Sequence, residues 1–123
     1  MVRRKEECPV SVRENMRGGN GSVQITDFVY KAELYNSGRL FADITLAPGC
    51  GIGEHVHVGE EEIFVVTAGE VVYNDNGEEK VCKVGDVLIC NDGEKHSIRN
   101  EGDVTASVTA LIMLKPRIEE DEE

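Results

Sequence analysis

Short segments with β-strand character, separated by turn residues, follow one another through most of this 123-residue chain. In residues 39–46 every even-numbered position is aliphatic, and this period of two puts alternate side chains on opposite faces of a strand. The Asn-Asp-Asn-Gly sequence at residues 74–77 predicts a hairpin, since Asn-Gly favours a type I′ turn. Further strands are expected at residues 23–28, 63–67, 71–73, 81–84, 87–90, 95–99 and 104–114. Apart from short helices at residues 11–17 or 30–35, the pattern predicts an all-β antiparallel sandwich or barrel.

The composition restricts both the size of the fold and its partners. A chain of this length holds one domain, and no apolar run nears the roughly 18 residues of a membrane span. With 24 acidic against 13 basic residues the net charge is −11, which disfavours nucleic acid and anionic membranes as partners. Residues 1–7 lack the apolar stretch of a secretory signal, so we expect a cytoplasmic protein. Its cysteines show no C-x-x-C spacing and are expected to be reduced: Cys8, Cys50, Cys82 and Cys90.

The three histidines of the chain all fall in two clusters that also contain regularly spaced glycines. Because side chains alternate along a strand, His55 and His57 are expected to point the same way. Glu62 follows a turn and opens the next strand, so its carboxylate can return to these imidazoles, and closure of the fold can add His96. The clusters read Gly49-x₅-His55-x-His57-x₄-Glu62-x₆-Gly69 and Gly85-x₅-Asn91-x-Gly93-x₂-His96-x₃-Asn100.

Three imidazoles and one carboxylate form a donor set without thiolate, which suits Mn²⁺, Fe²⁺, Co²⁺, Ni²⁺, Cu²⁺ or Zn²⁺. An octahedral ion with four protein ligands keeps two positions for water or substrate, whereas a tetrahedral Zn²⁺ would be filled. The sequence therefore predicts a divalent transition-metal site, of undefined metal identity, with the ligands His55, His57, Glu62 and His96. Glu60 is expected beside it in a loop, with Glu61, either as a solvated charge or as a proton-transfer group.

The two clusters resemble the two sequence motifs of the cupin superfamily, G-x₅-H-x-H-x₃₋₄-E-x₆-G and G-x₅-P-x-G-x₂-H-x₃-N. The first motif is matched throughout. In the second, Asn91 replaces proline, which alters the stiffness of a turn and removes no ligand. The resemblance covers about residues 23–114 and is specific for fold and metal but not for a reaction. More narrowly, the chain is similar to small single-domain bacterial cupins of the oxalate decarboxylase-like or oxalate-binding subgroup.

This resemblance implies a conical β-barrel of two antiparallel sheets, the jelly-roll-like double-stranded β-helix, with the metal inside the barrel mouth. It divides the chain into an N-terminal arm at residues 1–22, a cupin domain at 23–115 and an acidic tail at 116–123. Cupins of this size commonly pair into homodimers, and the arm can supply a strand to the neighbour's sheet. We therefore expect a homodimer.

The phase of the strands predicts which side chains line a pocket beside the metal. Two of them share the inward face of Glu62, one shares that of His96, and a further strand contributes its floor if that face points inward. Each has core packing as a competing interpretation. The predicted pocket residues are Phe64 and Val66, then Ile98, then Phe41 or Asp43.

Three functions fit such a site. A metal-dependent dioxygenase or decarboxylase would bind a small carboxylate, with the metal as Lewis acid. A non-catalytic binding or sensor protein is the second, and the absence of an obvious additional acid or base favours it slightly. A sugar isomerase or epimerase is the third, and it would need Tyr73 or Tyr30 as a base. No catalytic residue is assigned from the sequence.

Overall fold

The computed structural model describes residues 1–116, which form ten strands and three 3₁₀ turns. The strands are β1 (Val10–Glu14), β2 (Ser22–Asp27), β3 (Gly38–Leu46), β4 (Gly51–Val56), β5 (Glu60–Ala68), β6 (Glu70–Asp75), β7 (Glu78–Lys83), β8 (Val87–Cys90), β9 (Lys95–Arg99) and β10 (Ala106–Leu114). The turns are η1 (Lys5–Glu7), η2 (Met16–Gly18) and η3 (Lys31–Leu34). The all-β prediction is confirmed, and the segment considered for a helix at 11–17 is instead strand β1 followed by η2. No helix in residues 1–116 is long and apolar enough to cross a membrane.

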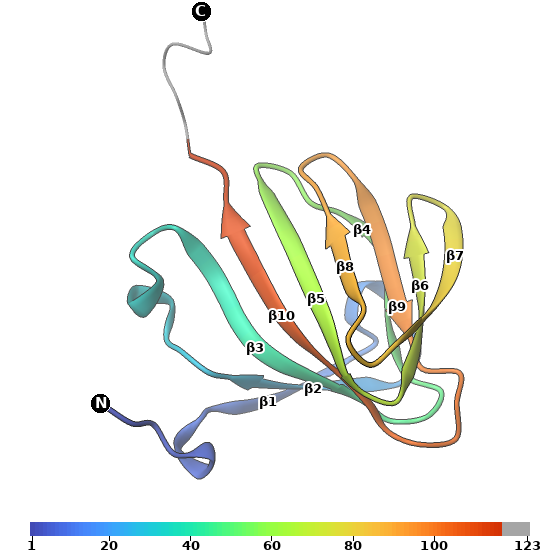
Figure 1. The fold of residues 1–123 in the computed structure, drawn as a ribbon, viewed down its shortest axis with the longest axis horizontal. Coiled ribbons are helices and arrows are strands. Elements are labelled where there is room, and N and C mark those ends of the chain that lie inside the picture. Colours follow the sequence, from blue (N-terminus) through green and yellow to red (C-terminus); the bar gives the residue numbers. More distant parts are fainter. Residues whose placement is uncertain (117–123) are drawn as a thin grey trace, which may run out of the picture.

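The strands form two antiparallel sheets that face each other across the core (Figure 1). One sheet has six strands in the order β1-β2-β3-β10-β5-β8, and the other has four in the order β4-β9-β6-β7. Neighbours in this order are often far apart in sequence, as in the pairing of β10 with both β3 and β5. This arrangement is the predicted double-stranded β-helix, in which strands from both halves of the chain meet at one site.

The alternation in residues 39–46 matches the burial of β3. Ala42, Ile44 and Leu46 are at most 2% exposed, and they pack into a core to which both sheets contribute. The β6–β7 hairpin also has the predicted turn, since Asn76 and Gly77 both have positive φ angles of 54° and 98°. The four cysteines are free thiols, as expected.

Two β-bulges change the phase of strands beside the predicted metal ligands. In β4, Ile52 pairs with Ile98 and His55 with His96, so two residues of β4 lie opposite a single residue of β9. This extra residue turns both Ile52 and His55 toward the inside of the barrel. In β3, the register against β10 shifts so that Arg39 has no cross-strand partner. Both irregularities redirect a side chain that a regular strand would point elsewhere.

The N-terminal segment is fixed against β4 of the same chain. Strand β1 pairs with β2, and the main chain of residues 16–20 then lies directly on β4. A Cβ atom on Gly53 would lie only 2.0 Å from the carbonyl oxygen of Arg17, so this approach requires a glycine. The Gly51 amide also donates to the Asn20 carbonyl at 3.0 Å. The division into arm, domain and tail stays a prediction, as does exchange of the arm in a homodimer, and residues 117–123 of the tail lie outside the described residues.

Candidate metal centre

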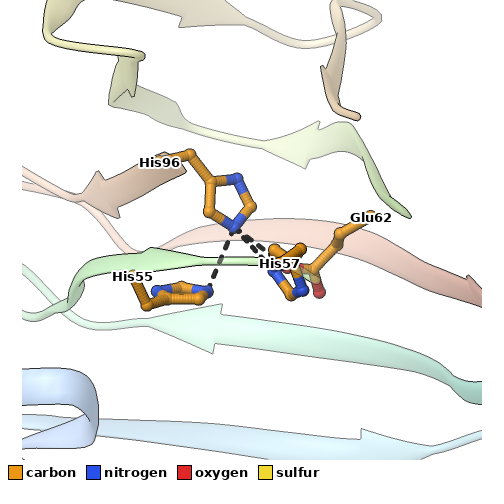
Figure 2. Close-up of side chains that lie close together, drawn as sticks. All are labelled: His55, His57, Glu62 and His96. Carbon is orange, nitrogen blue, oxygen red and sulfur yellow. Dashed lines mark hydrogen bonds and ion pairs between the residues drawn. The ribbon is translucent and has the colours of Figure 1, made fainter. Parts of the chain in front are cut away.

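The four predicted ligands converge on one point between the two sheets (Figure 2). Each offers one nitrogen or oxygen atom, and these four atoms all lie within 4.8 Å of one another. His55 and His96 are direct cross-strand partners on β4 and β9 of the four-stranded sheet. Glu62 comes from β5 of the six-stranded sheet, and His57 lies in the connection between β4 and β5. The cluster therefore depends on the packing of both sheets.

The backbone of His57 is held by the second sequence cluster. Its amide donates to the Glu94 carbonyl at 3.2 Å, and its carbonyl accepts from the Gly93 amide at 2.7 Å. Gly93 has φ +86°, a conformation that glycine adopts without strain. The second motif therefore supplies not only His96 but also the backbone contacts that position His57, a ligand of the first motif.

Each imidazole uses its Nδ1 atom for a partner outside the cluster. The Nδ1–H of His55 donates to the Gly53 carbonyl at 2.8 Å, and that of His57 donates to a carboxylate oxygen of Glu60 at 2.6 Å. The Nδ1 atom of His96 lies 2.8 Å from the hydroxyl oxygen of Tyr73. A carbonyl or carboxylate can only accept, so the contacts of His55 and His57 set the tautomer that leaves Nε2 unprotonated, whereas the Tyr73 hydroxyl can accept from His96 or donate to it. The Nε2 atoms of His55 and His57 thus present lone pairs to the cluster, and that of His96 does the same when its Nδ1–H donates to Tyr73.

The Nε2 atoms are arranged as metal ligands rather than as hydrogen-bond partners. The Nε2 atom of His96 lies 3.1 Å from that of His57 and 3.1 Å from that of His55. The Oε1 atom of Glu62 lies 3.1 Å from Nε2 of His57 and 3.2 Å from Nε2 of His96. Two unprotonated ring nitrogens cannot hydrogen-bond to each other. A cation between them can instead be coordinated by all four ligand atoms. The cluster fits a divalent-metal site.

The spacing also bears on the coordination number. With metal–ligand bonds of about 2.1 Å, neighbouring ligands are about 3.0 Å apart on an octahedral ion and about 3.4 Å apart on a tetrahedral one. The contacts of 3.1–3.2 Å around His96 and Glu62 lie between these two distances, so they are compatible with either coordination number. An octahedral ion held by four protein ligands has two positions left for a small ligand.

The electrostatics of the cluster favour positive charge at its centre. Burial raises the pKa of Glu62, but the imidazoles of His57 and His96 lower it by more, so that the carboxylate is ionised. The same carboxylate raises the pKa of His57, with burial acting against it. His55 has a lowered pKa, mainly because burial disfavours its charged form. A metal ion would replace the proton that this carboxylate attracts.

Glu60 holds one ligand in place and is not a free charge in a loop. It accepts the His57 Nδ1–H and is itself held by two hydrogen bonds from the Arg39 guanidinium, at 2.8 and 2.7 Å. Arg39, with His57 as the smaller contributor, lowers the pKa of Glu60 to about 2 despite partial burial. Arg39 reaches Glu60 from the bulge in β3. Of the two predicted roles for Glu60, neither matches this position, because both carboxylate oxygens are already bonded.

Replacing this carboxylate should weaken metal binding without abolishing it. In Glu60→Gln the amide keeps a hydrogen-bond acceptor for His57 but loses the charge that strengthens the contact, so we expect roughly 10- to 100-fold weaker metal affinity. Competition titration with a metallochromic chelator measures the change. Glu61→Gln is the matched control, because Glu61 lies opposite Met113 on β10 and makes no contact with the cluster. Equal affinities for the two variants would contradict the role of Glu60.

A cavity of about 350 Å³ opens directly on the cluster. Three arginines and several aliphatic side chains surround it, and Glu62 is its one acidic residue in the described part of the chain. It is lined by Arg13, Met16, Arg17, Ile25, Arg39, Leu40, Ile44, Ile52, His55, His57, Glu62 and Ile112. Arg13 and Arg17 belong to the segment that the sequence suggested only as an arm. No sequence motif marks them, since the loop and strand that place them there were not predicted.

None of the five predicted pocket residues lines this cavity. Phe64, Val66 and Ile98 are each 1% exposed and belong to the core, where the Phe64 ring stacks on the His96 imidazole at 5.4 Å. The structure places Phe41 and Asp43 on the outer face of β3, because Ala42 and Ile44, which alternate with them, face inward. There Phe41 contacts Phe28, and Asp43 accepts from Thr45.

The two tyrosines considered as bases for isomerase chemistry are not placed for that role. Tyr73 is 3% exposed, with its hydroxyl group engaged by His96, and burial raises its pKa further from neutrality. Tyr30 lies outside the cavity lining, on the surface beneath the Arg3 guanidinium. Both observations make the isomerase alternative less suitable.

A double-stranded β-helix with three histidines and one glutamate converging from its two sheets defines the class of metal-site β-barrels. Residues 42–112 match the family described as the cupin domain, and this chain belongs to that family. It is 41% identical to the oxalate-binding protein of Thermotoga maritima over 93% of this chain and 94% of that one.

Solved structures and a second relative agree with this assignment. The crystal structure of a predicted oxalate decarboxylase from Thermotoga maritima matches with a TM-score of 0.89 and 41% identity, covering 93% of this chain and 99% of that one. A tetracenomycin polyketide synthase protein of Streptomyces glaucescens is 36% identical over 62% of this chain and 52% of its own length. The resemblance to small single-domain cupins is confirmed.

Proposed function

We propose that this protein holds one divalent transition metal with His55, His57, Glu62 and His96 and uses it to bind a small carboxylate. The single observation that carries the proposal is the convergence of three Nε2 atoms and one carboxylate oxygen, with every Nδ1 atom occupied elsewhere. The oxalate-binding relative supports a carboxylate as the ligand. The donor set of nitrogen and oxygen, without thiolate, suits Mn²⁺, Fe²⁺, Co²⁺, Ni²⁺, Cu²⁺ or Zn²⁺.

The metal, when bound, supplies a Lewis acid with positions open to carboxylate oxygens. The protein side chains fix its ligands and shape the cavity around it. Gly53, Glu60 and Tyr73 orient the three imidazoles, while Ile44, Ile52 and other aliphatic side chains keep part of the wall dry. A small anion bound there lies beside cationic side chains rather than in open water.

The composition of the cavity favours binding over turnover. Decarboxylation or oxidative cleavage is helped by an acid or base that can move a proton at the reacting atoms. Among the described residues that line the cavity, Glu62 is the one carboxylate, and it belongs to the ligand set. Glu60 nearby is held between Arg39 and His57. We therefore propose a carboxylate-binding protein, with an oxalate decarboxylase-like enzyme as the alternative that the description of the similar Thermotoga maritima crystal structure supports.

Calorimetric titration of oxalate into protein reconstituted with Mn²⁺ tests this proposal. Binding of one oxalate per metal, with no oxygen uptake and no carbon dioxide or formate produced, supports a binding protein. Binding with turnover supports the enzyme alternative. Protein that carries one metal per chain and still binds no carboxylate would overturn both.

A further inference from the structure

The cavity above the metal centre carries positive charge that the fold does not neutralise. The chain has a net charge of −11, yet three of its arginines line this one cavity. Arg39 is paired with Glu60. Within residues 1–116, the ion pairs and side-chain hydrogen bonds include none from Arg13 or Arg17. Both residues are exposed to solvent, so their guanidinium donors are available to water or to an anion that enters the cavity.

The fold also fixes the main chain that carries these arginines. Arg13 is a residue of β1, which is paired along its length with β2. Arg17 lies in η2 with φ +54° and ψ +30°, a left-handed conformation that costs energy for a residue with a side chain. Its carbonyl is pressed against Gly53, two residues from the ligand His55. Strain held in place by close packing beside a site is typical of a functional segment.

The charges define the kind of ligand that would fit. A carboxylate ligand leaves one net positive charge on a divalent ion, and Arg39 and Glu60 balance each other. Arg13 and Arg17 then add two more positive charges with planar sets of donors that match carboxylate oxygens. A monocarboxylate satisfies the metal alone. A dianion satisfies the metal and also these guanidinium groups.

We infer that Arg13 and Arg17 form an anion-binding wall opposite the metal, and that the ligand is a small dicarboxylate whose outer oxygens accept hydrogen bonds from them. This inference rests on the proposed metal-dependent carboxylate binding and names the residues that select a dianion over a monoanion. The overall negative charge of the chain gives no long-range attraction for such a ligand, so short-range contacts within the cavity provide the selectivity.

The test compares oxalate with acetate on Mn²⁺-loaded wild type, Arg13→Gln, Arg17→Gln and the double variant, by calorimetry, with metal content measured on each protein. A charge-assisted hydrogen bond is lost with each arginine, so each single variant should bind oxalate about tenfold more weakly and the double variant weaker still. Acetate affinity should change by less than about threefold, because the metal alone holds it. All variants should keep the wild-type metal content, since neither arginine contacts a ligand atom.

Arg99→Gln is the matched control, because Arg99 is an arginine paired with Glu79 and Glu101 and does not line this cavity. It should bind oxalate as the wild type does. Arg17→Lys keeps the charge without the planar donor set and should recover only part of the loss. The inference would be overturned if the fully metal-loaded double variant kept its oxalate affinity, or if it lost affinity for oxalate and acetate equally. Either result would leave the proposed function intact. Wild-type protein that takes up metal but binds neither acid would instead refute the proposed function.

Discussion

His57→Ala should reduce the metal content from about one equivalent per chain to a small fraction of that. The substitution removes one of four ligands and leaves the carboxylates of Glu60 and Glu62 without the imidazole between them. Since losing a hydrogen-bond partner of a ligand already weakens metal binding 10- to 100-fold, losing the ligand itself should cost at least about a hundredfold. Elemental analysis after dialysis against a weak chelator measures the metal-to-chain ratio.

Glu54→Gln provides the matched control for this experiment. Glu54 lies next to His55 in β4, but its carboxylate accepts from the Asn74 side chain and is not among the ligand atoms. The control should keep the full metal content. Circular dichroism should show that His57→Ala remains folded, because most of the core is formed by other side chains. An unchanged metal-to-chain ratio in folded His57→Ala would rule out the four-ligand site.

Asn100→Ala should lower the free energy of unfolding by about 2–4 kcal/mol, which is a large share of the stability of a domain this size. Asn100 is 1% exposed, and its amide group donates to the carbonyls of Leu46 and Val104 at 2.9 and 2.8 Å. Its side-chain oxygen accepts from the Gly102 amide. Alanine would leave the buried carbonyl of Leu46, at the end of β3, without this partner, together with two part-buried backbone groups of the β9–β10 connection. Urea denaturation, read as a lower midpoint at an unchanged slope, measures the loss.

Asn91→Ala is the matched control, since the side chain of Asn91 is exposed and makes no hydrogen bond among the described residues. Its effect should stay within about 0.5 kcal/mol. The fraction of Asn100→Ala that is folded should bind metal as the wild type does, because Asn100 does not contact the cluster. A loss below about 1 kcal/mol would show that water or neighbouring groups replace these hydrogen bonds.

The strands that could be predicted are those whose two faces differ. In β3 and β9 the alternation of buried and exposed positions is carried by side chains of different polarity, and the predicted bounds 87–90 and 95–99 match β8 and β9. Strand β1 was not predicted, because four of its five residues are exposed and no apolar face marks it. Its existence depends on pairing with β2, which is a tertiary contact.

The metal ligands could be predicted for a different reason than their surroundings. Histidine and glutamate at fixed spacing are specific for a metal site whatever the strand geometry. The ligands His55, His57, Glu62 and His96 could therefore be predicted without knowledge of the strand register. Prediction of the residues that line the pocket does require the strand register. The bulge in β4 and the unpaired Arg39 in β3 change which side chains face inward, and no sequence signal marks either irregularity. Phe41 and Asp43 were expected at the floor only if their face of β3 pointed inward, and that face points outward.

Because the N-terminal segment packs on β4, two parts of the chain contribute to one cavity. The ligands lie between residues 55 and 96, inside the 42–112 stretch that matches the cupin domain, whereas Arg13, Arg17 and Arg39 all precede it. On the proposed roles, substitution of Arg13 or Arg17 would alter which anion is accepted without changing a metal ligand.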